Sequence, residues 1–96
     1  MTRYTKGRRL EWKTQRRLEA LGYHTLRTAG SHGPFDVHAW SKREAYYIQV
    51  KANKGPDKKE LRKLALTPVP PGAEKQIWIW RDYKPEPEII EVGGET

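Results

Sequence analysis

Three side chains in the middle of the chain have types and spacing suited to phosphodiester hydrolysis. Asp36 stands at the start of one β-like segment, and Gln49 and Lys51 stand two residues apart in the next. Because side chains alternate along a strand, Gln49 and Lys51 project to the same side. If the two segments pair as a hairpin, a carboxylate, an amide oxygen and an ammonium meet at one point. That set suits a divalent cation that handles phosphate.

A fourth candidate, Glu11, lies in a predicted helix near the N-terminus. It is one residue from Leu10 and seven from Leu18, which places it at the edge of the apolar face of the helix. Most charged residues of this helix are Lys and Arg, so a carboxylate at that edge is a candidate ligand. The alternative is an ordinary intrahelical partner for Gln15 or Arg8.

The other three candidates also have purely structural interpretations. Asp36 could cap a turn, and Gln49 and Lys51 could form the solvated face of an edge strand. All four residues nevertheless occur in the order that one chemistry requires, and this favours a shared site.

The elements that must position these residues follow from hydrophobic periodicity and turn residues. A helix is predicted from Lys6 to about Leu21, with Gly22 as its stop and Leu10, Leu18 and Leu21 near one face. Further along, the pattern predicts strands over 23–28, 35–40 and 45–52, a basic helix after Pro56, and strands over 76–83 and 88–92. The order α-β-β-β-α-β-β predicts a single α/β (α+β) domain, 1–96, around a mixed sheet, with flexible ends at 1–5 and 93–96.

The charge of the chain is strongly and unevenly basic. The net charge is +7, and residues 1–63 hold 16 Lys and Arg against 6 Asp and Glu, whereas 64–96 hold 3 against 6. Such a concentrated excess is typical of nucleic-acid binding, although a well-solvated surface is the alternative. There is no cysteine, and no apolar run approaches the roughly 20 residues that span a bilayer. We therefore expect a cytoplasmic, DNA-binding protein without membrane attachment.

This arrangement resembles the PD-(D/E)XK nuclease superfamily and, within it, the archaeal-type Holliday-junction resolvases. The similarity begins at Lys6-Gly7 and Glu11, continues through LEALGYHTLRTAGS, and reaches PFDV and IQVKANK. It extends more loosely through the second helix and the IWIW strand. The resemblance implies a restriction-endonuclease-like mixed β-sheet flanked by helices.

The same resemblance implies roles for individual residues. Asp36, Gln49 and Glu11 would hold Mg²⁺ or Mn²⁺, Lys51 would position or activate the attacking water, and Ser31 would lie near the scissile phosphate. Most members carry an acidic residue where this chain has Gln49. An amide oxygen can ligate a cation but brings no charge, so weaker metal binding and a single-metal site are expected.

Two basic segments flank this constellation and predict contacts with the DNA backbone. Either segment could instead contribute to an ordinary solvated surface. The predicted DNA-binding residues are Lys6, Arg8, Arg9, Arg27, His32, Lys54 and Lys58.

The predicted fourth strand is apolar on both faces. Trp78 and Trp80 share one face, and Ile77 and Ile79 share the other. The pattern indicates either a central core strand or a dimer interface. A homodimer would suit a four-way junction, which has approximate two-fold symmetry and needs two cuts.

The leading hypothesis is a Mg²⁺-dependent endodeoxyribonuclease that is structure-selective and resolves Holliday junctions as a homodimer. One alternative keeps the site but changes the target, as in a repair, restriction-like or phage nuclease that cuts flaps or duplex DNA. Another is a non-catalytic DNA-binding module in which Gln49 marks a lost activity. A ribonuclease or RNA-binding role is the remaining alternative.

Overall fold

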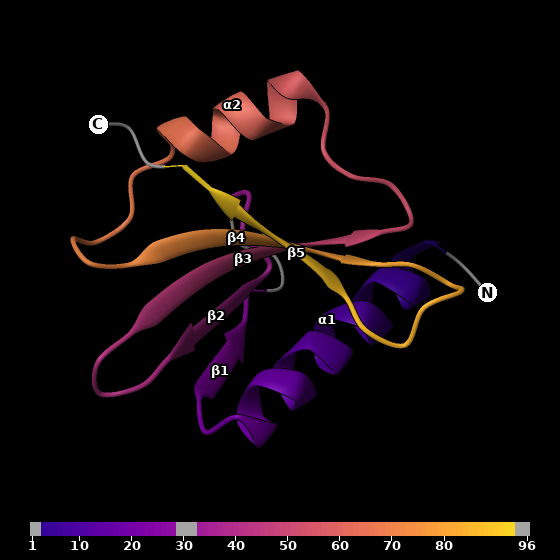
Figure 1. The fold of residues 1–96 in the computed structure, drawn as a ribbon, viewed down its shortest axis with the longest axis horizontal. Helices are drawn as coiled ribbons and strands as arrows, with labels where there is room; N and C mark the ends of the chain where they lie inside the picture. The colour runs from indigo at the N-terminus through magenta and orange to yellow at the C-terminus, as the bar shows by residue number, and fades with distance from the viewer. Residues whose placement is uncertain (1–2, 29–32, 94–96) are drawn as a thin grey trace.

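Two helices enclose a five-stranded sheet in the structure, a computed structural model that describes residues 3–28 and 33–93, with the backbone alone for 3–6. Figure 1 shows the chain from its N- to its C-terminus. The elements are α1 (Arg3–Ala20), β1 (His24–Arg27), β2 (Val37–Trp40), β3 (Ala45–Ala52), α2 (Lys58–Leu66), β4 (Glu74–Trp80) and β5 (Glu88–Val92). The predicted element order and α+β class are confirmed.

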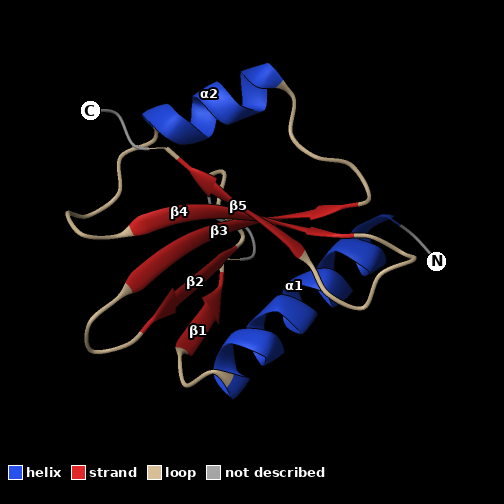
Figure 2. Ribbon diagram, viewed as in Figure 1, coloured by secondary structure: helices blue, strands red, loops and turns tan. Residues whose placement is uncertain are grey.

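The sheet is mixed, with its strands in sequential spatial order from β1 to β5. The pairs β1–β2, β2–β3 and β4–β5 are antiparallel, whereas β3 and β4 are parallel and are joined through α2. The helices lie on opposite faces of the sheet (Figure 2). Each therefore covers one apolar layer, and the centre of the sheet is buried on both sides.

Helix α1 is longer at its start than the sequence pattern predicted. It begins at Arg3 rather than Lys6, so the expectation of a loose tail is wrong for residues 3–5, while 94–96 and 1–2 lie outside the described residues. Gly22 follows the helix with a φ of +99°, a conformation that glycine adopts without steric cost. Leu21, predicted to be on the apolar face, is 67% exposed because the helix has already ended.

The tryptophans of β4 belong to the core of this chain. Trp78 and Trp80 face α1 and pack with Leu18, and each is only 3% exposed. The indole of Trp80 donates a hydrogen bond of 2.8 Å to the hydroxyl of Thr14, which is itself fully buried. These side chains are thus unavailable to another subunit, and their assignment to a dimer interface is wrong.

The opposite face of the sheet is covered by α2. Leu64 packs there on Ile77, Ile79 and Phe35. Strand β4 was predicted over 76–83 but spans 74–80. Its parallel ladder with β3 runs from Tyr46↔Glu74 to Ala52↔Trp80, over the whole of β4.

Candidate active site

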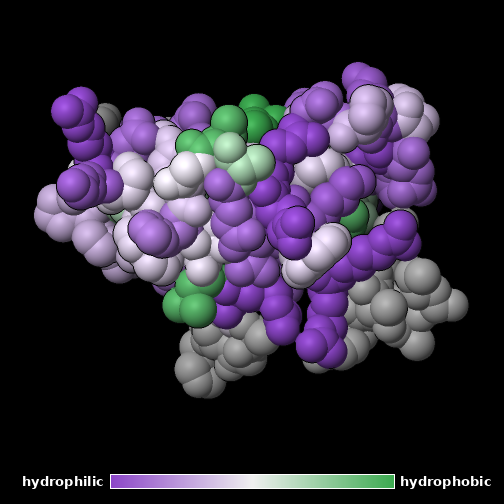
Figure 3. All heavy atoms as spheres, turned by 90° about the horizontal axis from the view of Figure 1, so that it is seen from below, coloured by the Kyte–Doolittle hydropathy of each residue, from purple (hydrophilic) through white to green (hydrophobic). Residues whose placement is uncertain are grey.

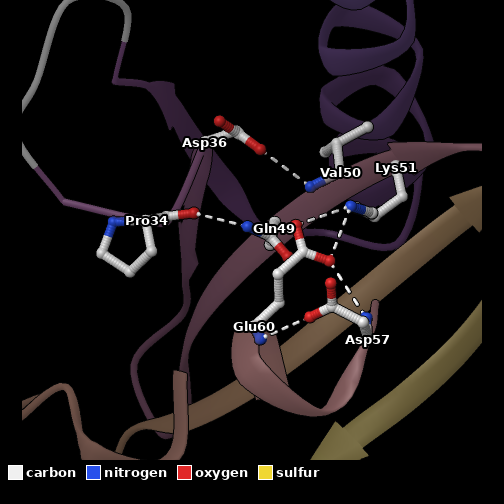
Figure 4. Close-up of polar contacts among 7 residues, drawn as sticks. All are labelled: Pro34, Asp36, Gln49, Val50, Lys51, Asp57 and Glu60. Atoms are coloured by element: carbon white, nitrogen blue, oxygen red, sulfur yellow. Dashed lines mark hydrogen bonds and ion pairs between the residues drawn. The ribbon is translucent and has the colours of Figure 1, made fainter. Parts of the chain in front are cut away.

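Asp36 lies immediately before β2, where the chain enters the sheet. Its backbone N–H donates to the carbonyl of Ile48 at 2.8 Å, and its carboxylate Oδ2 accepts from the N–H of Val50 at 2.9 Å. The hairpin of β2 and β3 predicted from the sequence is therefore confirmed, with Val37 opposite Ile48. The pairing fixes the Asp36 carboxylate beside the backbone between Gln49 and Lys51 (Figure 4).

The environment of Asp36 is unfavourable for a buried charge. Burial raises the pKa of Asp36 and the nearby charge of Glu11 raises it further, while the Val50 hydrogen bond and the charge of Lys51 lower it. The Val50 hydrogen bond and the charge of Lys51 do not offset burial, so the pKa of Asp36 stays above its ordinary value. Such a carboxylate would be stabilised by a bound cation.

Glu11 of α1 has a partner on β1. Its Oε1 accepts a hydrogen bond of 3.1 Å from Nη1 of Arg27, and the two side chains are 19% and 26% exposed. Gln15, one of the intrahelical partners considered from the sequence, donates its amide to the hydroxyl of Thr25 at 3.1 Å instead. Arg27 therefore orients Glu11, and its direct contact with DNA stays a prediction.

Gln49 contributes the most unusual polar atom of the site. Its amide nitrogen donates to the carbonyl of Pro34 at 3.3 Å, which fixes the orientation of the amide group. Its Oε1 is buried and accepts no hydrogen bond from any residue in the described part of the chain. A buried polar atom without a partner is costly, and a ligand that fills the coordination of this oxygen would remove that cost.

Lys51 forms an ion pair that the sequence analysis did not predict. Its Nζ lies 3.0 Å and 3.2 Å from the two carboxylate oxygens of Glu60, in the first turn of α2 (Figure 4). Glu60 also closes a capping box with Asp57, the N-cap residue that precedes α2. Hydrogen bonds from Lys51 and from the Asp57 backbone lower the pKa of Glu60, so it is a carboxylate at neutral pH.

A sequence signal for Glu60 existed but was incomplete. Asp57 followed three residues later by Glu60 is a recognisable helix-start motif, and Pro56 precedes it. The motif predicts the hydrogen bonds within α2. It does not predict the contact with Lys51, which depends on how α2 packs across the sheet.

The remaining predicted site residues occupy several places. Arg8 and Arg9 lie exposed on α1, Lys54 lies exposed between β3 and α2, and Lys58 is the exposed first residue of α2. The face on which α1 lies is mostly hydrophilic, with small hydrophobic patches (Figure 3). Lys6 belongs to α1, but its side chain, together with Ser31 and His32, lies outside the described residues.

The oxygen donors of the site are few but of the kind that a divalent cation binds. In the part of the chain that the structure describes, no three His, Cys, Asp or Glu side chains are grouped closely enough to hold a metal. Gln49 is not one of those four residue types, but its amide oxygen is the buried atom that accepts no hydrogen bond from the described residues. Together with the desolvated carboxylate of Asp36 it provides two hard oxygen donors, which Mg²⁺ and Mn²⁺ accept alongside water. These residues therefore fit such an ion.

The mixed sheet between two helices is the fold of the Hjc Holliday junction resolvases, which belong to the PD-(D/E)XK nuclease superfamily. Among solved structures, the chain is similar to the Holliday junction resolvase Hjc of the hyperthermophilic archaeon Archaeoglobus fulgidus. The two share 25% sequence identity with a TM-score of 0.74, over 91% of this chain and 73% of the other. No protein-family model matches the chain, and no curated protein matches it. Within the described residues, no helix is long and apolar enough to cross a membrane.

Proposed function

We propose that this chain is a metal-dependent, structure-selective DNA endonuclease that resolves four-way junctions. The observation that carries the proposal is the match to Hjc over 91% of the chain, with Asp36 and Lys51 on its central hairpin. The net charge of +7 supports a nucleic acid as the substrate.

The cation would be held by Asp36 and the free amide oxygen of Gln49, with Glu11 completing the site directly or through water. When bound, Mg²⁺ or Mn²⁺ supplies a polarised water and offsets negative charge on the phosphate. Ser31 is proposed to lie near the same phosphate.

Lys51 would act on the phosphate rather than on the cation. Its side chain is 23% exposed, so a phosphate oxygen can approach the ammonium from the solvent side. A donor fixed beside the scissile phosphate stabilises the charge that develops there during hydrolysis. Lys51 would also orient the attacking water.

The DNA arms would be bound through the backbone by basic residues on either side of this site. Contacts of this kind fix the orientation of the substrate without reading its sequence. The proposed contacts are Lys6, Arg8, Arg9, Arg27, His32, Lys54 and Lys58. A homodimer would supply two such sites for the two cuts. Since Trp78 and Trp80 are core residues, its interface must use other surfaces.

A second candidate function is a DNA-binding module that does not cleave. It is favoured by Gln49, because an uncharged ligand weakens the hold on a divalent cation, and by the lack of a three-acid cluster in the described residues. In that case the basic surfaces would bind DNA without hydrolysis.

The test is cleavage of a labelled four-way junction beside its linear duplex, with Mg²⁺, with Mn²⁺ and with EDTA. Paired symmetric nicks in the junction alone, abolished by EDTA, are expected. Cleavage of the duplex or of a flap at the same rate would instead indicate another DNA target. Junction binding without cleavage under every metal would support the non-catalytic alternative.

A further inference from the structure

The charges immediately around Asp36 do not favour a divalent cation when the sheet and α1 are considered alone. Among the described residues, Glu11 is the carboxylate whose charge acts on Asp36, but it is already paired with Arg27 at 3.1 Å. The ammonium of Lys51 adds a second positive charge close enough to affect Asp36. Because Gln49 is neutral, the two negative and two positive charges balance. A cation would gain little Coulomb attraction from such a set.

Glu60 changes this balance from outside the sheet. Both of its carboxylate oxygens contact the Nζ of Lys51, at 3.0 Å and 3.2 Å, and Lys51 lies on the same face of β3 as Gln49. The carboxylate is also fixed at its base, because Oε1 accepts the Asp57 N–H at 3.1 Å. The third negative charge is therefore held in one position beside the site.

Helix capping alone does not require a carboxylate at this position. Glutamine at the third helical position closes the same box, because its amide oxygen accepts the N–H of the capping residue. In this chain Oε2 of Glu60 makes no bond to Asp57 and contacts Lys51 instead. The charge of Glu60 is thus directed at β3.

We propose that Glu60 is a positioning residue of this site, which acts through Lys51 and supplies the negative charge that Gln49 lacks. The inference rests on the proposed function. With Glu60 included, three carboxylates are set against the two positively charged side chains of Lys51 and Arg27. The site then carries the net negative charge that attracts a divalent metal ion. The ion pair also keeps the ammonium of Lys51 beside Gln49.

The experiment measures Mn²⁺ binding to the full chain without DNA, by calorimetry, and junction cleavage in parallel. The proteins are the wild type, Glu60→Gln, Gln49→Glu and the double variant. We expect Glu60→Gln to lower the affinity for Mn²⁺ about tenfold, because one unit of negative charge is lost near the divalent ion in a partly exposed site. Gln49→Glu should strengthen it and should preserve or raise cleavage at low Mg²⁺.

The double variant is the decisive protein. It moves the charge from α2 back to β3, so its Mn²⁺ affinity should return to within about threefold of the wild type. A merely structural role of Glu60 in starting α2 would not be rescued by Gln49→Glu. Glu19→Gln, which removes one charge at the far end of α1, is the matched control and should leave Mn²⁺ affinity unchanged.

Two results would separate the failure of this inference from the failure of the proposed function. Wild-type Mn²⁺ affinity in Glu60→Gln, or a double variant no better than Glu60→Gln, would overturn the role of Glu60 alone. A wild type that neither binds Mn²⁺ nor cleaves any junction would overturn the proposed nuclease and this inference with it.

Discussion

The two ends of α2 each hold a lysine of the sheet, and they do so in different ways. At the C-terminal end, Lys75 of β4 donates to the backbone carbonyls of Leu64 and Ala65, both at 2.8 Å. At the N-terminal end, Lys51 of β3 is held by the side chain of Glu60. Lys75 is 8% exposed, whereas the Lys51 side chain is 23% exposed.

The difference separates a stabilising contact from one that is available for chemistry. The carbonyls that bind Lys75 are fixed in the backbone, and a cation there also meets the negative end of the helix dipole. The Glu60 side chain that binds Lys51 is 41% exposed, so a phosphate oxygen can reach the ammonium from solvent. We infer that Lys75 serves the fold and that Lys51 serves the site.

The largest expected effect comes from removing the ammonium at the N-terminal end of α2. Lys51→Ala should lower junction cleavage by more than about 100-fold, because a donor aimed at developing charge is lost. Junction affinity should stay within about tenfold, since backbone contacts elsewhere dominate binding. Stability should change little, because a partly exposed ion pair contributes about 0–1 kcal/mol. Single-turnover cleavage, gel-shift titration and thermal unfolding measure the three quantities.

The control for Lys51→Ala is Asp36→Asn, which should show the same split between cleavage and binding. If either variant lost binding in proportion to cleavage, these residues would hold the DNA rather than act on the phosphate. A large drop in melting temperature for Lys51→Ala would mean that Lys51 also stabilises the fold, as Lys75 does.

The second prediction concerns the buried lysine at the C-terminal end. Lys75→Met keeps the apolar stem but leaves the carbonyls of Leu64 and Ala65 without their donor. We expect a loss of about 1–3 kcal/mol in the free energy of unfolding, the usual cost of an unsatisfied buried group. Cleavage per folded molecule should be unchanged. Urea unfolding provides the measurement.

Lys63→Met, an exposed change on the same helix, is the matched control and should leave stability nearly unchanged. A Lys75→Met variant as stable as this control would mean that water replaces the ammonium at no cost. The contrast between the two ends of α2 would then rest on Lys51 alone.

Local sequence signals accounted for the order of the elements and for the pairing of the two segments that carry Asp36, Gln49 and Lys51. Alternation placed Gln49 and Lys51 on one face of β3, and Gly22 marked the end of α1, because both features depend on neighbours a few residues apart. The hairpin between β2 and β3 followed from the short turn at 41–44. The family resemblance then placed Asp36 and Lys51 in a nuclease-like arrangement.

The features that were missed depend on packing between distant parts of the chain. Arg27 holds Glu11 from 16 residues away, and Glu60 reaches Lys51 only because the chain after β3 turns back and places the first turn of α2 beside it. The burial of Trp78 depends on α1, which covers that face of β4. Periodicity reports which face is apolar, but it does not report whether a helix or a second subunit covers it.

The smallest expected effect is a gain in stability from Asp36→Asn without metal. Burial raises the pKa of Asp36, so the folded state binds this proton more tightly than the unfolded state does. The stability that this difference contributes is present at low pH and is lost as the pH rises through the raised pKa. Asparagine keeps an oxygen for the Val50 N–H but carries no charge. In EDTA, the variant should therefore melt a few degrees above the wild type at neutral pH.

The pH dependence of that gain distinguishes a desolvated charge from a change in packing. Below the ordinary pKa of 3.8 both side chains are neutral, so the two melting temperatures should converge. At neutral pH, saturating Mn²⁺ should reverse the order, because only the wild type keeps the carboxylate that binds the cation. A gain that persisted unchanged at low pH would come from packing. Asp36 would then resemble Lys75, as a residue of the fold, rather than Lys51.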